Sequence, residues 1–398
     1  MRVLFITSDY PANSSNIYTD LAKEINKNHS IKVVVATEKK NIIKTELLEE
    51  SGISVLRIKT GNLYEIGLVE KAITFLTISN DLIKGIKQYF ANEKFDLILF
   101  QAPPVTFNKV IKWAMKKYNC HSYLMQKDIF PQNGVDLGLF TKKSPIYMYF
   151  KVQEQKLYKT ATKIGCMTKG NIDYLKKNNP SLKDKFELFP NTAKVKKKEE
   201  LSKSERKEIR SKYGFKEDDV IAIFGGNFGK PQGLDFLIKV IDDYKNNSKI
   251  KFLLIGKGTE KNKVFEAVAN SPNVSTFDFL PRDDYNKLLL ASDIGLIFLD
   301  PRFTIPNCPS KTLSYWENSL PIMAAIDPIT DYGDLLETTS SGFSVISGNI
   351  KDYCEKFDKL INDSKFRNTM GKNGRTYYEQ KCDVSNSVKI LMKMKEGN

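Results

Sequence analysis

The clearest signal for chemistry lies in a glycine-rich segment at positions 224–234. This segment follows a strand-like run and precedes a helix-like one. Gly226 and Gly229 would let a ligand approach the backbone closely, and Lys230 would add a positive charge to N–H groups that can bind a diphosphate. The pattern matches neither G-x-G-x-x-G nor the P-loop motif, so a plain glycine turn is the alternative interpretation.

Two later segments could also bind a ligand, and the first of them repeats this arrangement. Gly256 and Gly258 follow the next strand-like run, where a ligand contact and a structural turn explain the pattern equally well. Ser310 could cap a helix that begins at Lys311, and a nearby anion would explain a lysine in the first turn, where the helix dipole disfavours it. Because lysine is abundant, chance placement is the alternative. Glu317 on the same helix could bind ribose hydroxyls or simply face water.

Polar residues in the first half of the chain could bind a second substrate. Ser14, Ser15 and Asn16 precede a helix-like run and could offer hydroxyls and backbone N–H groups to a polar ligand. A capped surface loop is the alternative for these three. Asp128 follows another strand-like run and could orient or deprotonate an acceptor hydroxyl, or form a turn ahead of proline.

Strand-like runs separated by helix-length segments must position these loops. Such alternation predicts parallel strands joined by crossover helices. The first series of runs is 3–7, 31–36, 55–58, 96–100, 123–126 and 164–167, and the second is 220–224, 252–255, 274–279, 295–299 and 322–325. Because open α/β sheets bind ligands beyond the carboxyl ends of their strands, we expect two Rossmann-like, doubly wound domains that face a cleft.

The domain boundary is expected in the charged segment 194–212, which is either a solvated linker or an exposed helix. With 398 residues the chain has room for two domains. We therefore expect an N-terminal domain at 1–193 and a C-terminal domain at 213–375. The tail from 365 onward predicts one or two helices, with a break at 370–374.

Composition narrows the possible partners and the cellular location. The formal charge of +15 favours an anionic partner, which could be nucleic acid, a membrane surface or a phosphorylated substrate. Five scattered cysteines argue against a disulfide framework, and only two histidines argue against a multi-histidine metal site. We expect a cytoplasmic protein, because neither a signal sequence nor an apolar run of about 18 residues is present.

Two segments predict a surface for lipid. The apolar face expected for the helix at 68–90 is broader than one core contact needs. From 141 to 163, aromatic residues accompany several lysines, and Glu154 is the only acid. These lysines are Lys142, Lys143, Lys151, Lys156, Lys159 and Lys163. Such a combination suits an anionic membrane surface, and a solvated basic helix packed on its aromatic side is the alternative.

Together these segments resemble the GT-B glycosyltransferases of glycosyltransferase family 4, in particular the capsule and O-antigen N-acetylfucosaminyltransferases. The resemblance spans essentially the whole chain. It rests on 128–133 with 136–138, on 189–191, on 226–230 with 232–234, on 256–258 and on 309–311. The order and spacing of these short motifs are specific, although each alone is weak.

The resemblance implies a retaining transfer without metal or cofactor. The C-terminal domain would hold a UDP-sugar, with an N-acetylated deoxyhexose such as L-FucNAc, and the N-terminal domain would hold a polyprenyl-diphosphate-linked saccharide. The last helix, within 376–398, would return to the first domain. The enzyme would work in capsule or O-antigen synthesis, peripherally associated with the inner face of the cell membrane, and no nucleic-acid partner is expected.

The resemblance also implies roles for individual residues. The catalytic residues would be Asp128 and Lys230, and the acceptor-side residues Ser14, Ser15, Asn16 and Asp128. The donor-binding residues would be Gly226, Asn227, Gly229, Lys230, Gln232, Gly256, Gly258, Ser310, Lys311 and Glu317. Lys230, Lys311 and the glycine-loop amides would stabilise the charge that develops on the leaving diphosphate.

Several family positions carry other residues here. Members commonly have two glutamates eight residues apart around the Pro-Ser-Lys helix, where this chain has Pro306 and Ser314, and Glu317 lies one turn later. Asn227 and Gln232 align with the usual arginine and lysine of the glycine loop, which leaves Lys230 as the phosphate cation. The frequent histidine before the rim aspartate is replaced by Lys127.

Two other functions fit parts of the sequence. A UDP-N-acetylhexosamine 2-epimerase shares the two-domain architecture, but it needs acid–base groups on both sides of the sugar ring, and no suitable set is evident. A non-catalytic basic protein that binds membrane or nucleic acid would fit the charge and the missing glutamate pair. The dispersed lysines and the lack of a nucleic-acid motif argue against it.

Overall fold

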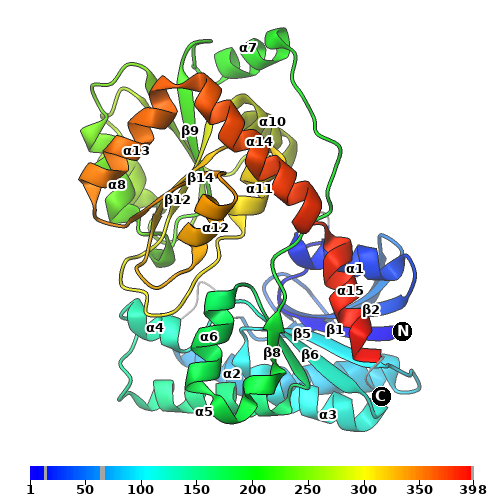
Figure 1. The fold of residues 1–398 in the computed structure, drawn as a ribbon. Coiled ribbons are helices and arrows are strands. Elements are labelled where there is room, and N and C mark those ends of the chain that lie inside the picture. Colours follow the sequence, from blue (N-terminus) through cyan, green and yellow to red (C-terminus); the bar gives the residue numbers. More distant parts are fainter. Residues whose placement is uncertain (13–15, 63–67, 396–398) are drawn as a thin grey trace. The chain divides into compact units, whose positions relative to one another are not determined.

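The computed structural model describes residues 1–12, 16–62 and 68–395, and the chain divides into two compact units. Unit 1 comprises Met1–Lys194 and Asp383–Asn398, and unit 2 comprises Val195–Cys382. Each unit is built around its own sheet, as Figure 1 shows.

Unit 1 contains an eight-stranded sheet with helices on both faces. Its first elements are β1 (Arg2–Thr7), α1 (Ile17–Asn26), β2 (Ser30–Glu38), β3 (Glu46–Glu50), β4 (Ile53–Thr60), α2 (Leu68–Phe90), β5 (Leu97–Ala102), the 3-10 helix η1 (Val105–Phe107), α3 (Asn108–Tyr118) and β6 (His121–Gln126). The others are α4 (Gln132–Asp136), α5 (Pro145–Thr160), β7 (Lys163–Cys166), α6 (Lys169–Asn178), η2 (Pro180–Lys185), β8 (Phe186–Leu188), α15 (Val384–Met392) and η4 (Lys393–Lys395).

The strand order in unit 1 is β3-β4-β2-β1-β5-β6-β7-β8, and all pairs are parallel except β3 with β4. The chain leaves the central strand β1 in opposite directions toward β2 and β5, which creates a topological switch point between β1 and β5. Every residue of β5 is buried, because helices cover both faces of a parallel sheet. Loops that follow β1 and β5 are therefore placed where such sheets bind ligands.

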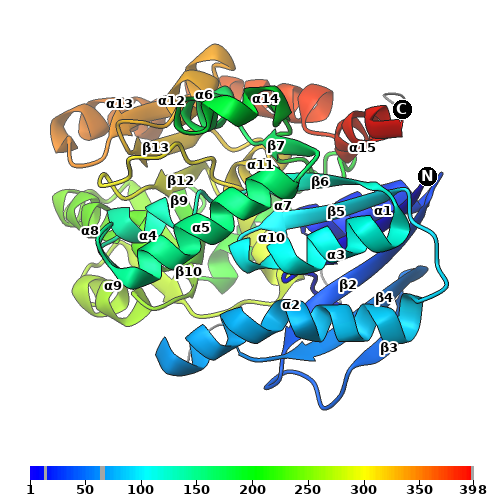
Figure 2. The ribbon, with the colours of Figure 1, turned by 90° about the horizontal axis from the view of Figure 1, so that it is seen from below.

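Helix α15 completes unit 1 although it is the last α-helix of the chain. Val384 and Leu391 join the same hydrophobic cluster as α1 and the β1 side of the sheet. The Thr192 and Ser387 hydroxyls form a buried hydrogen bond of 2.7 Å. The C-terminal segment thus packs on the opposite side of the sheet from α2, α3 and α5, which Figure 2 shows in front.

Unit 2 contains a six-stranded, fully parallel sheet. Its elements up to the middle strand are α7 (Lys203–Lys212), β9 (Val220–Asn227), the 3-10 helix η3 (Lys230–Gln232), α8 (Leu234–Asp243), β10 (Ile250–Lys257), α9 (Lys261–Val268), β11 (Val274–Phe277), α10 (Arg282–Ala291) and β12 (Ile294–Phe298). They are followed by α11 (Lys311–Glu317), β13 (Ile322–Ile326), α12 (Tyr332–Thr338), β14 (Gly342–Ile346), α13 (Ile350–Asn362) and α14 (Ser364–Lys381).

The strand order β11-β10-β9-β12-β13-β14 places the switch point of unit 2 between β9 and β12. Helix α13 shows how the sequence builds this layer: Tyr353, Phe357, Leu360 and Ile361 lie at helical spacing and are all buried. The ring of Phe357 packs at a tilt against Phe252 of β10, so the helix covers the sheet with aromatic rings. The β9 and β12 loops are held by this packed layer.

The predicted α/β class with two doubly wound sheets is confirmed, but two details of the prediction are wrong. The short strands β3, β8 and β14 were not expected, because glutamates interrupt β3, β8 has only three residues, and Gly and Ser shorten the apolar run of β14. The predicted break at 370–374 is absent, since α14 continues through it and ends before Cys382. The charged segment at 194–212 contains α7, which is the exposed helix that the sequence left open, and its buried Arg210 pairs with Asp293 at 2.6 Å.

Candidate functional site

The two glycine loops of unit 2 pack directly against each other at the carboxyl ends of β9 and β10. Gly226 and Gly256 are register partners, and a Cβ atom on Gly256 would collide with the Gly226 carbonyl oxygen. A Cβ atom on Gly258 would likewise collide with the carbonyl of Phe228. The backbone N–H of Phe228 donates to Lys257 O at 2.7 Å, which fixes the contact. Loop packing therefore requires glycine at 256 and 258, whether or not a ligand binds there.

Gly226 differs from the other glycines of this site. Its φ of 119° favours glycine, yet a Cβ atom there would meet open space. The next residue, Asn227, is exposed, and its side-chain amide lies close to Gly229. This part of the loop consequently presents polar groups and free backbone surface outward, as an approaching phosphate would require.

The β9 loop is tied to the end of β12 across the switch point. Gly233 adopts a φ of 54° and lies so close to the Leu299 carbonyl that a side chain would not fit. The backbone N–H of Asp300 donates to Pro231 O at 3.0 Å. The turn η3, which carries Lys230 and Gln232, is thereby held beside the strand where parallel sheets bind ligands.

Lys311 at the start of α11 contacts this loop. Its Nζ donates to Gln232 Oε1 at 2.8 Å and lies 3.9 Å from the centroid of the Phe224 ring. None of the ion pairs among the described residues includes Lys311. Burial lowers the pKa of Lys311 to about 7, because no carboxylate offsets the loss of hydration. An anion placed beside Nζ would restore the charged form.

The loop before α11 is held by a buried aspartate at the end of β13. Asp327 accepts hydrogen bonds from the backbone N–H groups of Ile329 and Thr330 and from Asn307 Nδ2. The Thr330 hydroxyl donates to Asn307 O at 2.6 Å. These bonds fix the loop that leads into Lys311.

Ser310 occupies the residue before α11, as predicted, but its side chain makes no capping hydrogen bond. Its φ of −66° and ψ of −24° are already helical, whereas a capping residue normally has extended backbone angles. The prediction that Ser310 caps the helix is therefore wrong. A donor-binding role for its hydroxyl stays a prediction.

Glu317 ends α11, six residues after Lys311, which at about 100° per residue places it on a different face of the helix. Its backbone carbonyl accepts from Arg375 Nη1 of α14 at 2.7 Å. Ser314, three residues after Lys311, lies on the Lys311 face instead. The structure does not bring Glu317 toward the glycine loops, and its predicted contact with ribose stays a prediction.

Lys230 is exposed on η3, and no ion pair among the described residues involves it. The cation is thus available to solvent at the same loop that Lys311 contacts through Gln232. The structure brings together Lys230, Gln232, Lys311 and the glycine loops, which are most of the predicted donor-binding residues.

In unit 1, Asp128 lies in the loop that follows β6 at the carboxyl edge of the sheet. Gln126 Nε2 donates to Asp128 O at 2.7 Å. Lys127 Nζ donates to Asn191 Oδ1 at 2.8 Å, which joins two motifs far apart in sequence. Desolvation raises the pKa of Asp128, although the residue as a whole is exposed, and the nearby Lys127 charge opposes this shift. A carboxyl with a raised pKa suits proton transfer.

Asn16 caps α1, as the polar run before this helix indicated. Its side-chain oxygen accepts from the N–H groups of Tyr18 and Thr19, both at 2.9 Å, and its Nδ2 donates to Asp9 Oδ1 at 3.3 Å. The capping interpretation, left open from the sequence, accounts for Asn16 within unit 1. Ser14 and Ser15 lie outside the described residues.

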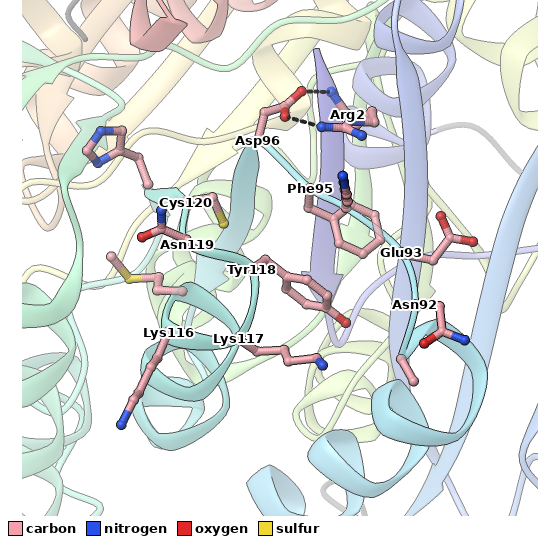
Figure 3. A pocket seen from close by; sticks show the side chains of 14 residues that line it. Arg2, Asn92, Glu93, Phe95, Asp96, Lys116, Lys117, Tyr118, Asn119 and Cys120 are labelled. Atoms are coloured by element: carbon pink, nitrogen blue, oxygen red, sulfur yellow. Dashed lines mark hydrogen bonds and ion pairs between the residues drawn. The ribbon is translucent and has the colours of Figure 1, made fainter.

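A cavity of about 900 Å³ lies in unit 1 at the opposite edge of the sheet, where β5 and β6 begin. Figure 3 shows Arg2 and Asp96 paired in its wall, and the ion pair measures 2.8 Å. Burial raises the pKa of Cys120 in its wall to about 12, so this thiol is a poor nucleophile. None of the predicted site residues lines this cavity. One of the two histidines of the chain, His121, is part of its wall.

Two features are absent from the residues that the structure describes. No group of three or more His, Cys, Asp or Glu side chains among them could hold a metal ion. Within the same described part of the chain, no helix combines the length and the apolar character that crossing a membrane requires.

Sequence reasoning missed some residues that position the site. Phe224 was recognised only as part of a strand, and its ring lies under Lys311. Asp327 was not singled out, although an aspartate directly after the apolar strand β13 is the same signal that identified Asp128. Asn191 belonged to a recognised motif, but its contact with Lys127 joins distant segments and has no local signature.

Comparison with known proteins agrees with this geometry. Residues 205–377 match the family model described as glycosyl transferases group 1. A capsular polysaccharide biosynthesis glycosyltransferase, CapM of Staphylococcus aureus, is 28% identical over 173 residues, which is 41% of this chain and 42% of CapM. The aligned segment spans less than half of that relative.

Solved structures resemble the whole chain. Sucrose-phosphate synthase from Thermosynechococcus elongatus has a TM-score of 0.77 at 13% identity and covers 100% of this chain and 99% of its own. Anabaena HepE in complex with UDP-glucose has a TM-score of 0.71 at 14% identity, with 100% of both chains covered. These likenesses confirm the predicted GT-B fold.

Proposed function

Because residues 205–377 form a glycosyl transferases group 1 domain within a GT-B fold, we propose that this protein is a retaining glycosyltransferase. It moves a sugar from a nucleotide diphosphate to the hydroxyl of a saccharide acceptor. The β9/β12 loops of unit 2 bind the donor, and the carboxyl-edge loops of unit 1 bind the acceptor.

The environment of Lys311 is the single observation that carries this proposal. Burial lowers the pKa of Lys311 to about 7, and its Nζ contacts an amide and an aromatic ring. An anion beside Nζ would therefore stabilise the charged lysine strongly. The position at the switch point of the sheet is where α/β domains bind ligands. A diphosphate between Lys311 and the exposed Lys230 satisfies both observations.

The same contacts would supply catalysis. As the bond between the anomeric carbon and the diphosphate oxygen breaks, negative charge grows on the leaving group, and two cations with fixed amides stabilise it. The acceptor oxygen attacks the anomeric carbon from the face that the diphosphate leaves, which retains the configuration. Its proton passes to a phosphate oxygen or to Asp128.

Asp128 would orient the acceptor hydroxyl. Its raised pKa makes it a better base than an ordinary aspartate, and the bonds of Gln126 and Lys127 to their neighbours hold the loop in place. The carboxyl edge of unit 1 otherwise offers amides and hydroxyls, such as Gln101 and Ser8, which suit the hydroxyl groups of a saccharide.

The finer assignment follows the resemblance of the sequence. We assign the donor to a UDP-sugar carrying an N-acetylated deoxyhexose and the acceptor to a polyprenyl-diphosphate-linked saccharide of capsule or O-antigen synthesis. The name of CapM supports the capsule assignment, and HepE was solved with UDP-glucose, which supports UDP. Such an acceptor would place the enzyme at the cytoplasmic face of the membrane.

A transfer assay tests this function. The full chain is incubated with a panel of nucleotide sugars and a polyprenyl-diphosphate-linked saccharide, and both nucleoside diphosphate release and the lengthened lipid-linked product are measured. We expect equal amounts of both, with the α- or β-configuration of the donor kept in the product. An inverted product would reject the retaining mechanism, and no product with any donor would reject the transferase assignment.

A control without acceptor separates the epimerase alternative. UDP-N-acetylglucosamine incubated alone should remain unchanged, whereas an epimerase would convert it. The positions of the two histidines already argue against an epimerase. His29 precedes β2, and His121 begins β6, so both stand at the amino edge of the sheet, away from the candidate loops.

A further inference from the structure

An exposed surface of unit 1 combines lysines with protruding aliphatic side chains. We call this surface the basic face and define it as the outward sides of α3 and α5 together with the loop 139–143. The two helices pack against each other and cover the same side of the sheet, where Figure 2 shows them in front. Thr160 at the end of α5 donates to Asn108 at the start of α3, at 2.9 Å.

One stripe of α5 carries both kinds of side chain. Met148, Val152, Lys156 and Lys159 recur at helical spacing on the side opposite the buried Phe150 and Leu157, and all four are exposed. Their order along the helix places the aliphatic residues first and the lysines last. The exposed fractions of Met148 and Val152 are 54% and 49%. Leu139 and Ile146, also exposed, extend the aliphatic part toward the preceding loop.

The charge of the basic face is uniformly positive. Helix α3 contains no acid and exposes Lys109, Lys112, Lys116 and Lys117. The loop before α5 exposes Lys142 and Lys143. Glu154 is the only acid from 137 to 160, and it is buried and paired with Lys151 at 2.5 Å. No carboxylate within these segments therefore competes with an external anion.

The helices beneath this face are held rigidly. Phe150 of α5 contacts Phe75 of α2 at 5.0 Å between ring centroids and Phe130 at 4.9 Å. On α2, Ile78, Leu82 and Ile86 are buried, so part of the apolar face predicted for this helix is core. Ile73 and Leu76 are exposed, and they lie on either side of Phe75. Val69 and Ala72 belong to the apolar face expected for 68–90, and their side chains are outside those that the structure describes.

We infer that the basic face docks the protein onto an anionic lipid bilayer. Rows of lysines bind acidic headgroups, and the aliphatic side chains of Met148, Val152, Leu139 and Ile146 enter the interfacial layer of the bilayer. These side chains are already exposed, so they can leave water without any unfolding of the protein. Nucleic acid would use the lysines but gain little from projecting aliphatic side chains, since it is bound through phosphates, base edges and stacking on rings. The inference deepens the membrane placement of the proposed function by naming the surface that makes the contact, and it does not depend on the transfer reaction.

Vesicle cosedimentation tests this inference with the full chain and without nucleotide sugar or acceptor. We expect binding to vesicles of phosphatidylcholine with phosphatidylglycerol and little binding to phosphatidylcholine alone. Lys156→Glu/Lys159→Glu should lower the partition coefficient by about tenfold or more. Met148→Ser/Val152→Ser should lower it by about threefold to tenfold. Because the four side chains are exposed, the melting temperature should not change.

Matched controls remove the effect of net charge and of general apolar loss. Lys239→Glu/Lys351→Glu makes the same charge change at exposed positions of unit 2, and Ile43→Ser/Leu47→Ser removes exposed aliphatic side chains elsewhere in unit 1. Both controls should bind vesicles like the unchanged protein. Equal losses in test and control variants would overturn the inference. The inference would also be overturned if a DNA duplex displaced the protein from vesicles and Met148→Ser/Val152→Ser left vesicle binding unchanged.

A failed transferase assay would leave this result intact, because sedimentation requires no turnover. Conversely, a basic face that binds no vesicle would overturn the docking inference while the donor site in unit 2 could still be active.

Discussion

The two sheets of this protein use the same topology but surround their switch points with opposite chemistry. At β9 and β12 of unit 2, glycines bring backbone close to backbone, and Lys230 and Lys311 supply positive charge. At β1 and β5 of unit 1, Thr7 Oγ1 donates to Gln101 Oε1 at 2.9 Å, and exposed Asp9 lies beside them. One edge suits an anion, and the other suits neutral hydroxyl groups.

This difference shows how one fold can be adapted to two kinds of substrate. A parallel sheet determines where a ligand can bind, but the loop residues determine which charge it carries. In unit 2, desolvation lowers the pKa of Lys311, whereas in unit 1 desolvation raises the pKa of Asp128 and of Asp9. The shift of Lys311 means that a bound anion would stabilise its charged form, and the shifts of the two aspartates raise their affinity for a proton, as a group that accepts a proton from a hydroxyl requires.

Removing the Lys311 cation should have the largest effect. Lys311→Met keeps most of the contact with Phe224 but removes the charge, and we expect kcat/KM for transfer to fall by about 10³-fold. Steady-state kinetics with a UDP-sugar would measure this. The matched variant Lys239→Met, at an exposed position on α8, should keep its activity. If kcat/KM fell by less than about threefold in Lys311→Met, the proposed difference in charge between the two edges would be wrong.

Gly256→Ala should destabilise unit 2, because its Cβ atom would collide with the Gly226 carbonyl and its φ is 151°. We expect the free energy of unfolding to fall by about 3 kcal/mol. Gly214→Ala is the control, since its φ of 82° is also positive but it has open space around it, and it should cost about 1 kcal/mol. Urea unfolding monitored by circular dichroism compares them. Similar losses in both variants would show that the loop contact is not tight.

Asp128→Asn should lower turnover without weakening donor binding, which would distinguish the acceptor edge in unit 1 from the donor edge in unit 2. Loss of the orienting or basic carboxylate should lower kcat by about 10²-fold. The dissociation constant for UDP should stay within about twofold, because Asp128 belongs to unit 1 and the proposed diphosphate contacts belong to unit 2. Kinetics and calorimetric titration give the two values. A weaker UDP affinity with unchanged kcat would assign Asp128 to the donor instead.

Lys230→Ala should have a smaller effect than Lys311→Met, since Lys230 is exposed and water can partly replace it. Turnover should fall by about tenfold to thirtyfold, with little change in the melting temperature. Turnover assays and thermal unfolding measure both quantities. Unchanged turnover would remove Lys230 from the mechanism.

Donor binding should weaken as the pH rises above about 7, where free Lys311 loses its proton. A bound diphosphate favours the protonated amine, so the dissociation constant should rise by up to about tenfold per pH unit, with a proton taken up on binding. In the free protein the same lowered pKa means that unfolding binds a proton between about 7 and 10.5, and stability rises with pH there.

Calorimetric titration of a UDP-sugar in two buffers of different ionisation enthalpy would measure this proton uptake at pH 8. Lys311→Met should abolish it. A dissociation constant that is independent of pH from 7 to 9 would contradict the assignment of this lysine to the diphosphate.

The sequence predicted what depends on local pattern. Apolar runs such as 220–224 and 252–255 identified strands, and glycines after them identified the donor loops. It failed where a feature depends on packing. The edge strand β3 reads as charged residues, and α14 runs through two glycines because Gly371 and Gly374 let the helix approach Ser319 and Trp316 closely.

The candidate site was predicted in the same uneven way. Lys311 and Gln232 were both expected to bind the donor, but a contact across 79 positions of sequence cannot be derived from spacing. The ring of Phe224 lies below Lys311 and gives the lysine apolar surroundings. This contact could be seen only in the three-dimensional structure. The Ser310 cap was wrong because the preceding loop, held by Asp327, already directs the chain into helical geometry.

A crystal structure of the protein with UDP tests the central claim most directly. We expect the diphosphate within hydrogen-bonding distance of Lys311 Nζ and Lys230 Nζ, beside the open backbone of Gly226. Density for the nucleotide at any other part of unit 2 or in unit 1, or a protein that takes up no UDP at millimolar concentration, would contradict it.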